Sequence, residues 1–310
     1  MVNKTLAYTG WKKWNPTDEE WNTFCIENKV PFDMQENEYL IVYDNDNIAY
    51  YYCYEKGKFR PFKGGSIKTV KENLPDEFIE VEEIRKKKAT KKYAKGKQTV
   101  IYPRNDEQVC AFDLLRDERK TVKLLCGVWG SGKDLLMANS ALEALRLGKY
   151  EKIIWLRNNV RTKDTPDLGA LPGEVWDKLC AYVGPFIDSV GEDSVRTMLQ
   201  KGTLKVEPLQ SIRGRNFANS IIICSEAENL TYDHLKLIVA RVAEGSCLFI
   251  NGDVRQRDLA TFEKSQGLEK FIECLKGESL FGYVYLPKTE RSDTAKLADK
   301  LDTFEFGENR

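Results

Sequence analysis

The sequence predicts an α/β protein whose mostly parallel central sheet is covered by helices on both faces and preceded by a small α+β module. Apolar, partly β-branched runs alternate with helical patterns over the larger part of the chain. Five of these runs suit buried strands, at residues 121–126, 153–157, 220–224, 247–251 and 283–286. Because strands that alternate with helices pair in parallel, this order predicts a ligand at the carboxyl ends of the strands.

The composition is that of a globular protein with room for one large domain and a small one. The chain has 310 residues, of which 42% are hydrophobic and 31% are charged. No apolar run approaches the ~18 residues of a membrane span, and no apolar signal segment follows Met1. These features predict a cytoplasmic protein without a membrane partner.

Cysteine and histidine usage excludes some classes of site. The eight cysteines are scattered, and no pair has the spacing of a zinc or redox motif, so we expect reduced thiols in the core. The one histidine, His234, argues against a Ser-His-Asp hydrolase and against sites built from several imidazoles. It lies in a helix-like stretch, where we expect a structural role.

Residues 1–84 are predicted to form a separate, aromatic-rich module. Thr17-Asp18-Glu19-Glu20 is a capping box that opens a helix to about Asn28. Residues 39–54 predict a hairpin around a turn at 44–47, and Lys56-Gly57-Lys58 could add a third strand.

A tyrosine cluster in this module has two interpretations. Its members are Tyr50, Tyr51, Tyr52 and Tyr54. Their rings could stack on nucleic-acid bases. Alternatively, they fill the minor core of a small aromatic sheet, which is the favoured interpretation.

Residues 85–98 are predicted to be a basic linker to a main domain at 99–310. Although the net charge of the chain is +0, eight basic and no acidic residues lie between Arg85 and Lys97. The run could be a phosphate-binding strip for RNA or DNA, or a solvated connector. The sequence leaves both open.

A glycine-rich loop between the strand at 121–126 and a helical pattern at 135–147 has the spacing of a phosphate-binding P-loop. Its glycines let successive N–H groups point into one cavity, and Lys133 would reach the β- and γ-phosphates. A plain glycine-rich turn is the alternative. The predicted ATP-binding residues here are Gly127, Val128, Trp129, Gly130, Ser131, Gly132, Lys133 and Asp134.

The loop departs from the usual pattern at Asp134, where a serine or threonine is expected. The apolar run 220–224 ends in Ser225-Glu226, where the second nucleotide motif usually has Asp-Glu. We hypothesise a swap in which Asp134 and Ser225 together supply the carboxylate and the hydroxyl for Mg²⁺, while Glu226 orients the attacking water. The competing interpretation is a site that binds nucleotide weakly or does not hydrolyse it.

A third motif, Gly252-Asp253-Val254-Arg255-Gln256, closes the run at 247–251. In helicase-like ATPases, such a segment lies beside the γ-phosphate. Gln256 is expected to sense that phosphate, and Asp253 to link it to the nucleic-acid side. Alone, the motif could be a turn at the end of a strand.

Together, these motifs resemble the PhoH-like family, and in particular its phage-associated branch. The resemblance covers about residues 100–310 and implies a RecA-like P-loop NTPase fold, similar to the motor domains of superfamily 1 helicases. Asp134, Ser225 and Glu228 depart from the family pattern. The motifs that carry the resemblance are Tyr102-Pro103-Arg104-Asn105 with Gln108, 127–134, 169–173, Ile212-Arg213-Gly214-Arg215, Glu226-Ala227-Glu228-Asn229-Leu230-Thr231, Arg241, Gly252-Asp253 with Gln256 and Asp258, and Arg291-Ser292.

The resemblance also implies roles for residues outside the loop. Gln108 would read the adenine edge, with Arg104 nearby. Arg241 and Arg291 are candidates for an arginine that acts on the γ-phosphate, from the same or a neighbouring subunit. Further candidates, for phosphate or nucleic-acid contact, are Arg213 and Arg215. Any of these arginines could instead make surface ion pairs.

The expected function is Mg²⁺-dependent hydrolysis of ATP, coupled to single-stranded RNA or DNA as in a helicase-like motor. The alternative is a nucleotide-regulated nucleic-acid-binding protein with little or no hydrolysis. A motor of this kind needs two motor domains and the sequence has one, so we expect a homo-oligomer, for which a ring is one form. If the chain is phage-encoded, the expected compartment is the host cytoplasm.

Overall fold

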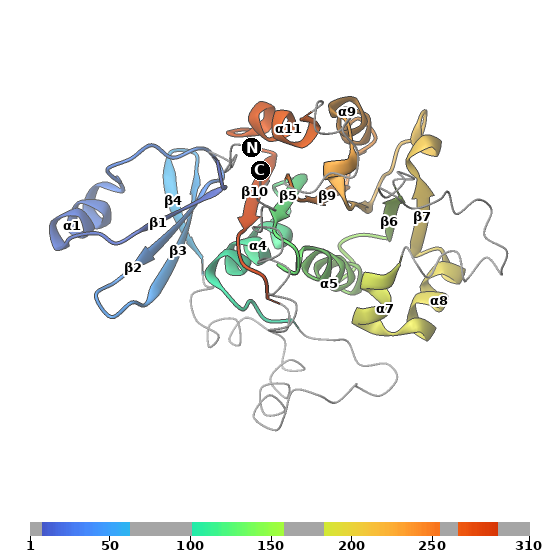
Figure 1. Cartoon of the computed structure of the whole chain (residues 1–310), viewed down its shortest axis with the longest axis horizontal. Helices are drawn as coiled ribbons and strands as arrows, with labels where there is room; N and C mark the ends of the chain where they lie inside the picture. Colours follow the sequence, from blue (N-terminus) through green and yellow to red (C-terminus); the bar gives the residue numbers. More distant parts are fainter. Residues whose placement is uncertain (1–7, 63–100, 158–182, 255–265, 291–310) are drawn as a thin grey trace, which may run out of the picture.

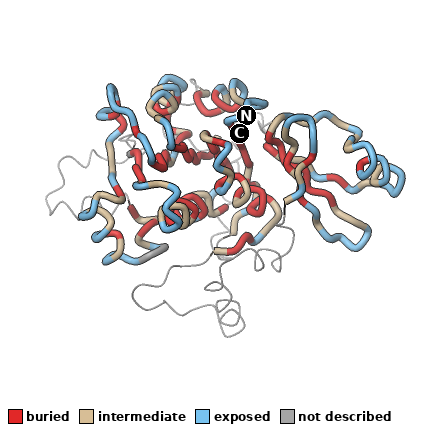
Figure 2. Tube along the Cα trace, turned by 180° about the vertical axis from the view of Figure 1, so that it is seen from behind, coloured by how far each residue is buried: buried red, intermediate tan, exposed pale blue. Residues whose placement is uncertain are grey.

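The computed structural model describes residues 8–62, 101–157, 183–254 and 266–290. A six-stranded sheet forms the centre of the main domain, and a four-stranded sheet with one helix lies beside it (Figure 1). Buried residues concentrate along the strands of the two sheets (Figure 2). The predictions for residues 85–98, 169–173, Gln256, Asp258, Arg291 and Ser292 lie outside the described residues.

The large sheet has the order β10-β5-β9-β8-β6-β7, and every neighbouring pair is parallel. The predicted α/β fold and all five predicted strands are confirmed. β7 was missed because it is short and alternates apolar with polar residues at the sheet edge. The bounds are β5 (Val122–Gly127), β6 (Lys152–Arg157), β7 (Leu204–Pro208), β8 (Ser220–Cys224), β9 (Cys247–Gly252) and β10 (Phe281–Leu286).

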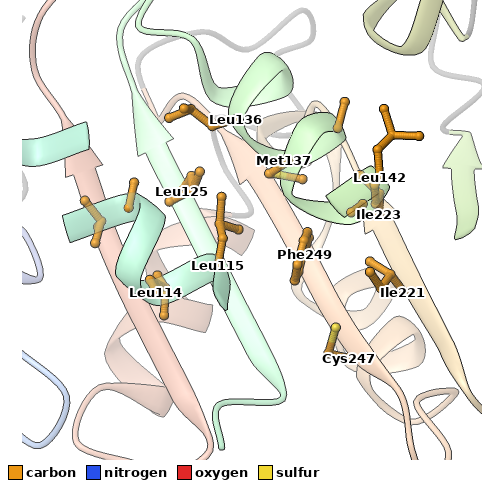
Figure 3. Close-up of a cluster of buried hydrophobic side chains, with 14 of the residues drawn as sticks. Leu114, Leu115, Leu125, Leu136, Met137, Leu142, Ile221, Ile223, Cys247 and Phe249 are labelled. Carbon is orange, nitrogen blue, oxygen red and sulfur yellow. The ribbon is translucent and has the colours of Figure 1, made fainter. Parts of the chain in front are cut away.

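Helices cover both faces of this sheet because successive strand residues point to opposite sides. On one face, α4 (Asp106–Arg116), α5 (Lys133–Arg146), α7 (Gly184–Val190) and α8 (Glu192–Lys201) pack over the side chains of Leu125, Ile221 and Phe249, as Figure 3 shows for α4 and α5. On the other face, α9 (Tyr232–Val239) and α11 (Gly267–Leu275) pack over Leu124, Ile222 and Ile250. Two short 3₁₀ turns, η2 (Leu209–Ile212) and η3 (Ala227–Asn229), follow β7 and β8.

The small sheet contains β1 (Trp11–Trp14), β2 (Tyr39–Tyr43), β3 (Ala49–Glu55) and β4 (Lys58–Phe62). The predicted hairpin, third strand and Thr17 capping box of α1 (Asp18–Glu27) are confirmed. β1, which pairs in parallel with β2, was missed because two lysines occupy the middle of this short strand.

The two faces of the small sheet bury different sets of side chains. Tyr39 and Tyr51 belong to the same hydrophobic cluster as α4 of the main domain. Leu40 and Val42 face the opposite way, toward α1. The small sheet therefore shares a core with the main domain.

Most of the tyrosine cluster is used in packing. Tyr52 packs edge-on against Phe24 with ring centroids 5.1 Å apart, and Tyr54 lies 5.0 Å from Phe59. Tyr50 is the most accessible of the four, at 42% exposed. These contacts favour the interpretation in which the tyrosines fill a core.

The segment before β1 runs along the outer side of β10. The Tyr285 N–H donates to the Thr9 carbonyl at 2.9 Å, and the Trp11 indole donates to the Tyr285 carbonyl at 2.7 Å. Gly10 makes this approach possible, because a Cβ there would lie 1.9 Å from the Tyr283 carbonyl oxygen. The segment therefore covers an edge that would otherwise present unpaired backbone groups.

His234 accepts the Thr231 N–H at 3.4 Å within the capping box of α9, which is a structural role. None of the helices described is both long and apolar enough to cross a membrane.

Candidate nucleotide-binding site

The glycine-rich loop joins the end of β5 to the start of α5, which is the predicted order of strand, loop and helix. Gly130 and Gly132 have φ angles of 68° and 88°, in the left-handed region that favours glycine. A Cβ on Gly127 would lie 2.3 Å from the Leu286 carbonyl oxygen. The loop conformation therefore requires its glycines.

The chain that follows β10 holds the loop from one side. The Val128 N–H donates to the Leu286 carbonyl at 3.1 Å, and the Glu290 N–H donates to the Gly130 carbonyl at 2.9 Å. The Thr289 hydroxyl donates to the Trp129 carbonyl at 2.8 Å. These bonds fix the loop from a segment distant in sequence.

The first turn of α4 holds the loop from another side through Gln108. The Gln108 Nε2 donates to the Ser131 carbonyl at 2.9 Å, and its Oε1 accepts the Arg104 N–H at 2.8 Å. The Arg104 guanidinium donates to the carbonyl of Glu290. Gln108 and Arg104, the residues predicted to contact adenine, thus lie beside the loop and hydrogen-bond to it or to the chain that holds it. Their contact with a base stays a prediction.

The loop retains polar groups suited to an anionic ligand. Lys133 Nζ donates to the carbonyls of Gly127 and Val128 at 2.6 and 3.0 Å, so its charge is held at the loop. The hydroxyl of Ser131 is buried without a hydrogen-bond partner among the described residues. Buried hydroxyls are usually satisfied, so this group and the left-handed glycines fit a bound phosphate.

Asn251 connects Asp134 of the first motif to Glu226 of the second motif. Its Nδ2 donates to the Asp134 carboxylate at 2.6 Å, and its Oδ1 accepts the Glu226 N–H at 3.1 Å. The contact arises because β9 lies between β5 and β8 in the sheet. Asn251, near the end of β9, therefore reaches both the phosphate-binding loop region after β5 and the motif after β8. Sequence reasoning did not single out Asn251, although a polar residue in the apolar run 247–251 was a signal.

Glu226 and Glu228 lie in different environments. Glu226 is exposed and has a φ of 56°, whereas the Glu228 carboxyl oxygen Oε2 accepts the Asp253 N–H at 3.0 Å. Burial raises the pKa of Glu228 to about 8, despite the backbone N–H donors and the nearby Lys133, which lower it. Gly252 is needed here because a Cβ would lie 2.8 Å from the Glu228 Oε2. Glu228, noted in the sequence only as a departure, is therefore a second carboxyl group of the site.

The donor set also fits the metal ion expected at such a site. Asp134 lies in the first turn of α5 and Ser225 directly follows β8, so both lie at the carboxyl ends of the strands. No group of three or more His, Cys, Asp or Glu side chains that could hold a metal occurs within the described ranges. A P-loop Mg²⁺ takes most of its ligands from phosphate oxygens and water, so a carboxylate and a hydroxyl suffice. The swap stays a prediction.

The structure does not bring Arg241 to the carboxyl ends of the strands. Arg241 follows α9 and lies near the amino ends of the strands. Its carbonyl accepts the N–H of Phe217, which precedes β8, at 3.0 Å. Its own guanidinium donates to the Arg215 carbonyl at 3.3 Å. The Arg215 guanidinium pairs with Glu207 at 2.6 Å, while Arg213 is exposed. Arg241 is therefore remote from the loop of its own chain.

A glycine-rich loop followed by a lysine, set between a parallel strand and a helix, defines a P-loop protein of the NTPase class, with a nucleotide-binding site. The family model described as PhoH-like protein matches residues 100–298. The chain belongs to this family. The match covers the large sheet and leaves out the small sheet.

Curated relatives carry the same family name. The chain is 36% identical to Protein PhoH2 of Bacillus subtilis (strain 168) over 213 residues, which are 65% of this chain and 47% of the relative. It is 31% identical to a PhoH-like protein of the same organism over 229 residues, covering 73% and 68% of the two chains. The chain spans about half the length of the first relatives it matches.

Among solved structures, the large terminase of a thermophilic bacteriophage has a TM-score of 0.42 and 11% sequence identity to this chain. The match covers 66% of this chain and 51% of the terminase.

Proposed function

We propose that the chain binds ATP together with Mg²⁺ and hydrolyses it to ADP and phosphate. The observation that carries this proposal is the buried amide of Asn251, which joins the Asp134 carboxylate to the backbone of Glu226. Asp134 is one end of this connection, and Ser225 is the residue directly before its other end, Glu226.

Each residue has a distinct task in this proposal. The loop N–H groups and the start of α5 bind the phosphates, and Lys133 exchanges its carbonyl partners for phosphate oxygens. Asp134 and Ser225 hold the metal, and Glu226 orients the water that attacks. Mg²⁺, when bound, supplies positive charge that offsets Asp134 and the phosphates. Gln256 and Asp253 keep their proposed roles beside the γ-phosphate.

We further propose that hydrolysis is coupled to single-stranded RNA or DNA, as in a helicase-like motor of the cytoplasm. The eight basic residues between Arg85 and Lys97 support this, because clustered cations bind phosphate backbones. A homo-oligomer, with a ring as one form, would supply a second motor domain. Because Arg241 lies near the amino ends of the strands, away from the loop of its own chain, it would act on the γ-phosphate of a neighbouring subunit.

Phosphate release from ATP tests the proposal, measured at several Mg²⁺ concentrations with and without single-stranded RNA or DNA. Turnover should require Mg²⁺, and it should be lost in Lys133→Ala and Glu226→Gln. Lys149→Ala is a matched control, because this lysine makes an ion pair with the exposed Glu118.

A second outcome distinguishes the alternative function. If ATP raises the melting temperature of the wild-type chain without turnover above the Lys133→Ala variant, the chain is a nucleotide-regulated binding protein. Nucleic-acid affinity that is unchanged by high salt would count against the basic run as the contact.

A further inference from the structure

The first turn of α4 lies between the small sheet and the phosphate-binding loop. Asn105 caps the helix by accepting the Gln108 N–H at 2.8 Å, and Asp106 and Glu107 follow it. The side chains of Asn105, Asp106 and Glu107 each contact a different partner, as described below. This turn connects a module outside the matched family region to the nucleotide-binding site.

On the module side, β1 and the hairpin contact two acidic residues. Lys13 Nζ lies 2.7 Å from the Glu107 Oε1. The hydroxyls of Tyr43 and Tyr51 donate to the two oxygens of Asp106 at 2.5 and 2.6 Å. All three module residues therefore hold the start of α4.

On the loop side, Asn105 Nδ2 donates to the Glu290 Oε1 at 2.5 Å, and two further routes lead from the same turn to the P-loop. Gln108, next to Glu107, donates to the Ser131 carbonyl at 2.9 Å. Lys288 Nζ lies 3.9 Å from the Glu107 Oε2, and the residues that follow it, Thr289 and Glu290, bond to the loop.

We propose that Lys13 is a positioning residue for the nucleotide site, acting through Glu107 on the Gln108 contact with the loop. The inference rests on the proposed nucleotide binding and adds a role for the small sheet.

The burial of Glu107 explains why one lysine matters. The Glu107 side chain is 1% exposed, and its Oε2 has no hydrogen-bond partner within the described residues. In this part of the chain, its charge therefore depends on the close contact with Lys13 and on the more distant Lys288. Removing Lys13 leaves a buried carboxylate that must move or take up a proton. Because Gln108 is the next residue in the helix, such a shift disturbs the P-loop, where small displacements have large effects.

The test uses the full-length chain and a fluorescent ATP analogue with Mg²⁺. Lys13→Met should weaken affinity by about threefold to tenfold, which lies within the range seen for coupled positions outside a ligand contact. Lys13→Met/Glu107→Gln should restore most of it, because the buried charge is removed together with its partner. Lys12→Met is the matched control on the same strand, where Lys12 pairs with Glu38 at 3.7 Å.

The melting temperature of the free protein is measured in parallel. Equal affinity of Lys13→Met and the wild type would overturn the inference while leaving the nucleotide site intact. A loss of affinity that follows the melting temperature and is not rescued by Glu107→Gln would also overturn it. A wild-type chain that does not bind nucleotide, or binds equally in Lys133→Ala, would remove the proposed function itself.

Discussion

The Asn251 amide donates to the Asp134 carboxylate at 2.6 Å, across the boundary between β9 and α5. Only one orientation of the amide serves both neighbours, since a carboxylate accepts and the Glu226 N–H donates. The carboxylate at position 134 thus has a defined partner. The departure from serine or threonine is built into the packing of the site.

Replacing Asp134 by the usual P-loop residue should therefore weaken the site. We expect Asp134→Thr to lower Mg²⁺-dependent ATP affinity by about tenfold or more, because it removes the proposed metal carboxylate together with a charge-assisted hydrogen bond of about 1.5–3 kcal/mol to Asn251. Asp134→Thr/Ser225→Asp, which restores the ordinary motif pair, should recover part of the loss. The measurement is nucleotide affinity against Mg²⁺ concentration. A rise in affinity and turnover in the single variant would refute the swap.

Stability should depend on pH through Glu228. Burial raises its pKa in the folded state from 4.5 to about 8, so the folded protein holds a proton that the unfolded chain releases. Stability then falls as pH rises from about 4.5 to 8, with a slope of at most ~1.4 kcal/mol per pH unit. Denaturant titrations of the wild type and Glu228→Gln over this range check it. The two proteins should differ in slope, with the variant flatter, whereas equal slopes would show that Glu228 does not titrate there.

Trp129 should report nucleotide binding. It is 56% exposed on the phosphate-binding loop, so a ligand that covers the loop should shift its emission to shorter wavelengths. Trp129→Phe should lose most of this change while keeping affinity within about threefold, because its backbone makes the Thr289 contact. Trp21→Phe, in α1 beside the small sheet, is the control that should keep the signal. If the emission shift persists in Trp129→Phe, a tryptophan other than Trp129 produces it.

Gly10 should be irreplaceable. An alanine Cβ would lie 1.9 Å from the Tyr283 carbonyl oxygen, and φ is +75°. Gly57, with φ of +76° and open space, is the matched control. We expect Gly57→Ala to cost about 1–2 kcal/mol of unfolding free energy, and Gly10→Ala clearly more, measured by urea denaturation. Equal costs would mean that the segment before β1 can leave the edge of β10.

The sequence was sufficient for elements whose signal is local. The apolar runs of β5, β8 and β9 identified buried strands, and the spacing of Gly127, Gly132 and Lys133 identified the loop. β1 and β7 escaped because short edge strands carry polar residues on one side, and their pairing depends on partners far along the chain.

Relations between motifs required the topology. Asn251 contacts Asp134 because β9 lies between the two motif strands, an order that no single stretch of sequence encodes. Arg241 lies away from the loop because α9 runs back toward the start of β9. From the sequence alone, the side chains of Tyr39 and Tyr51 could point to solvent, to α1 or to α4. In the structure, they are buried in the cluster that includes α4.

The loop at 127–132 is held by Leu286, Thr289 and Glu290, and β10 in turn pairs with β5 and receives Thr9 along its outer side. During synthesis, the loop leaves the ribosome long before these residues do. Nucleotide binding and the pairing of Thr9 with the sheet must therefore both await β10, which makes them late events in the folding of the nascent chain.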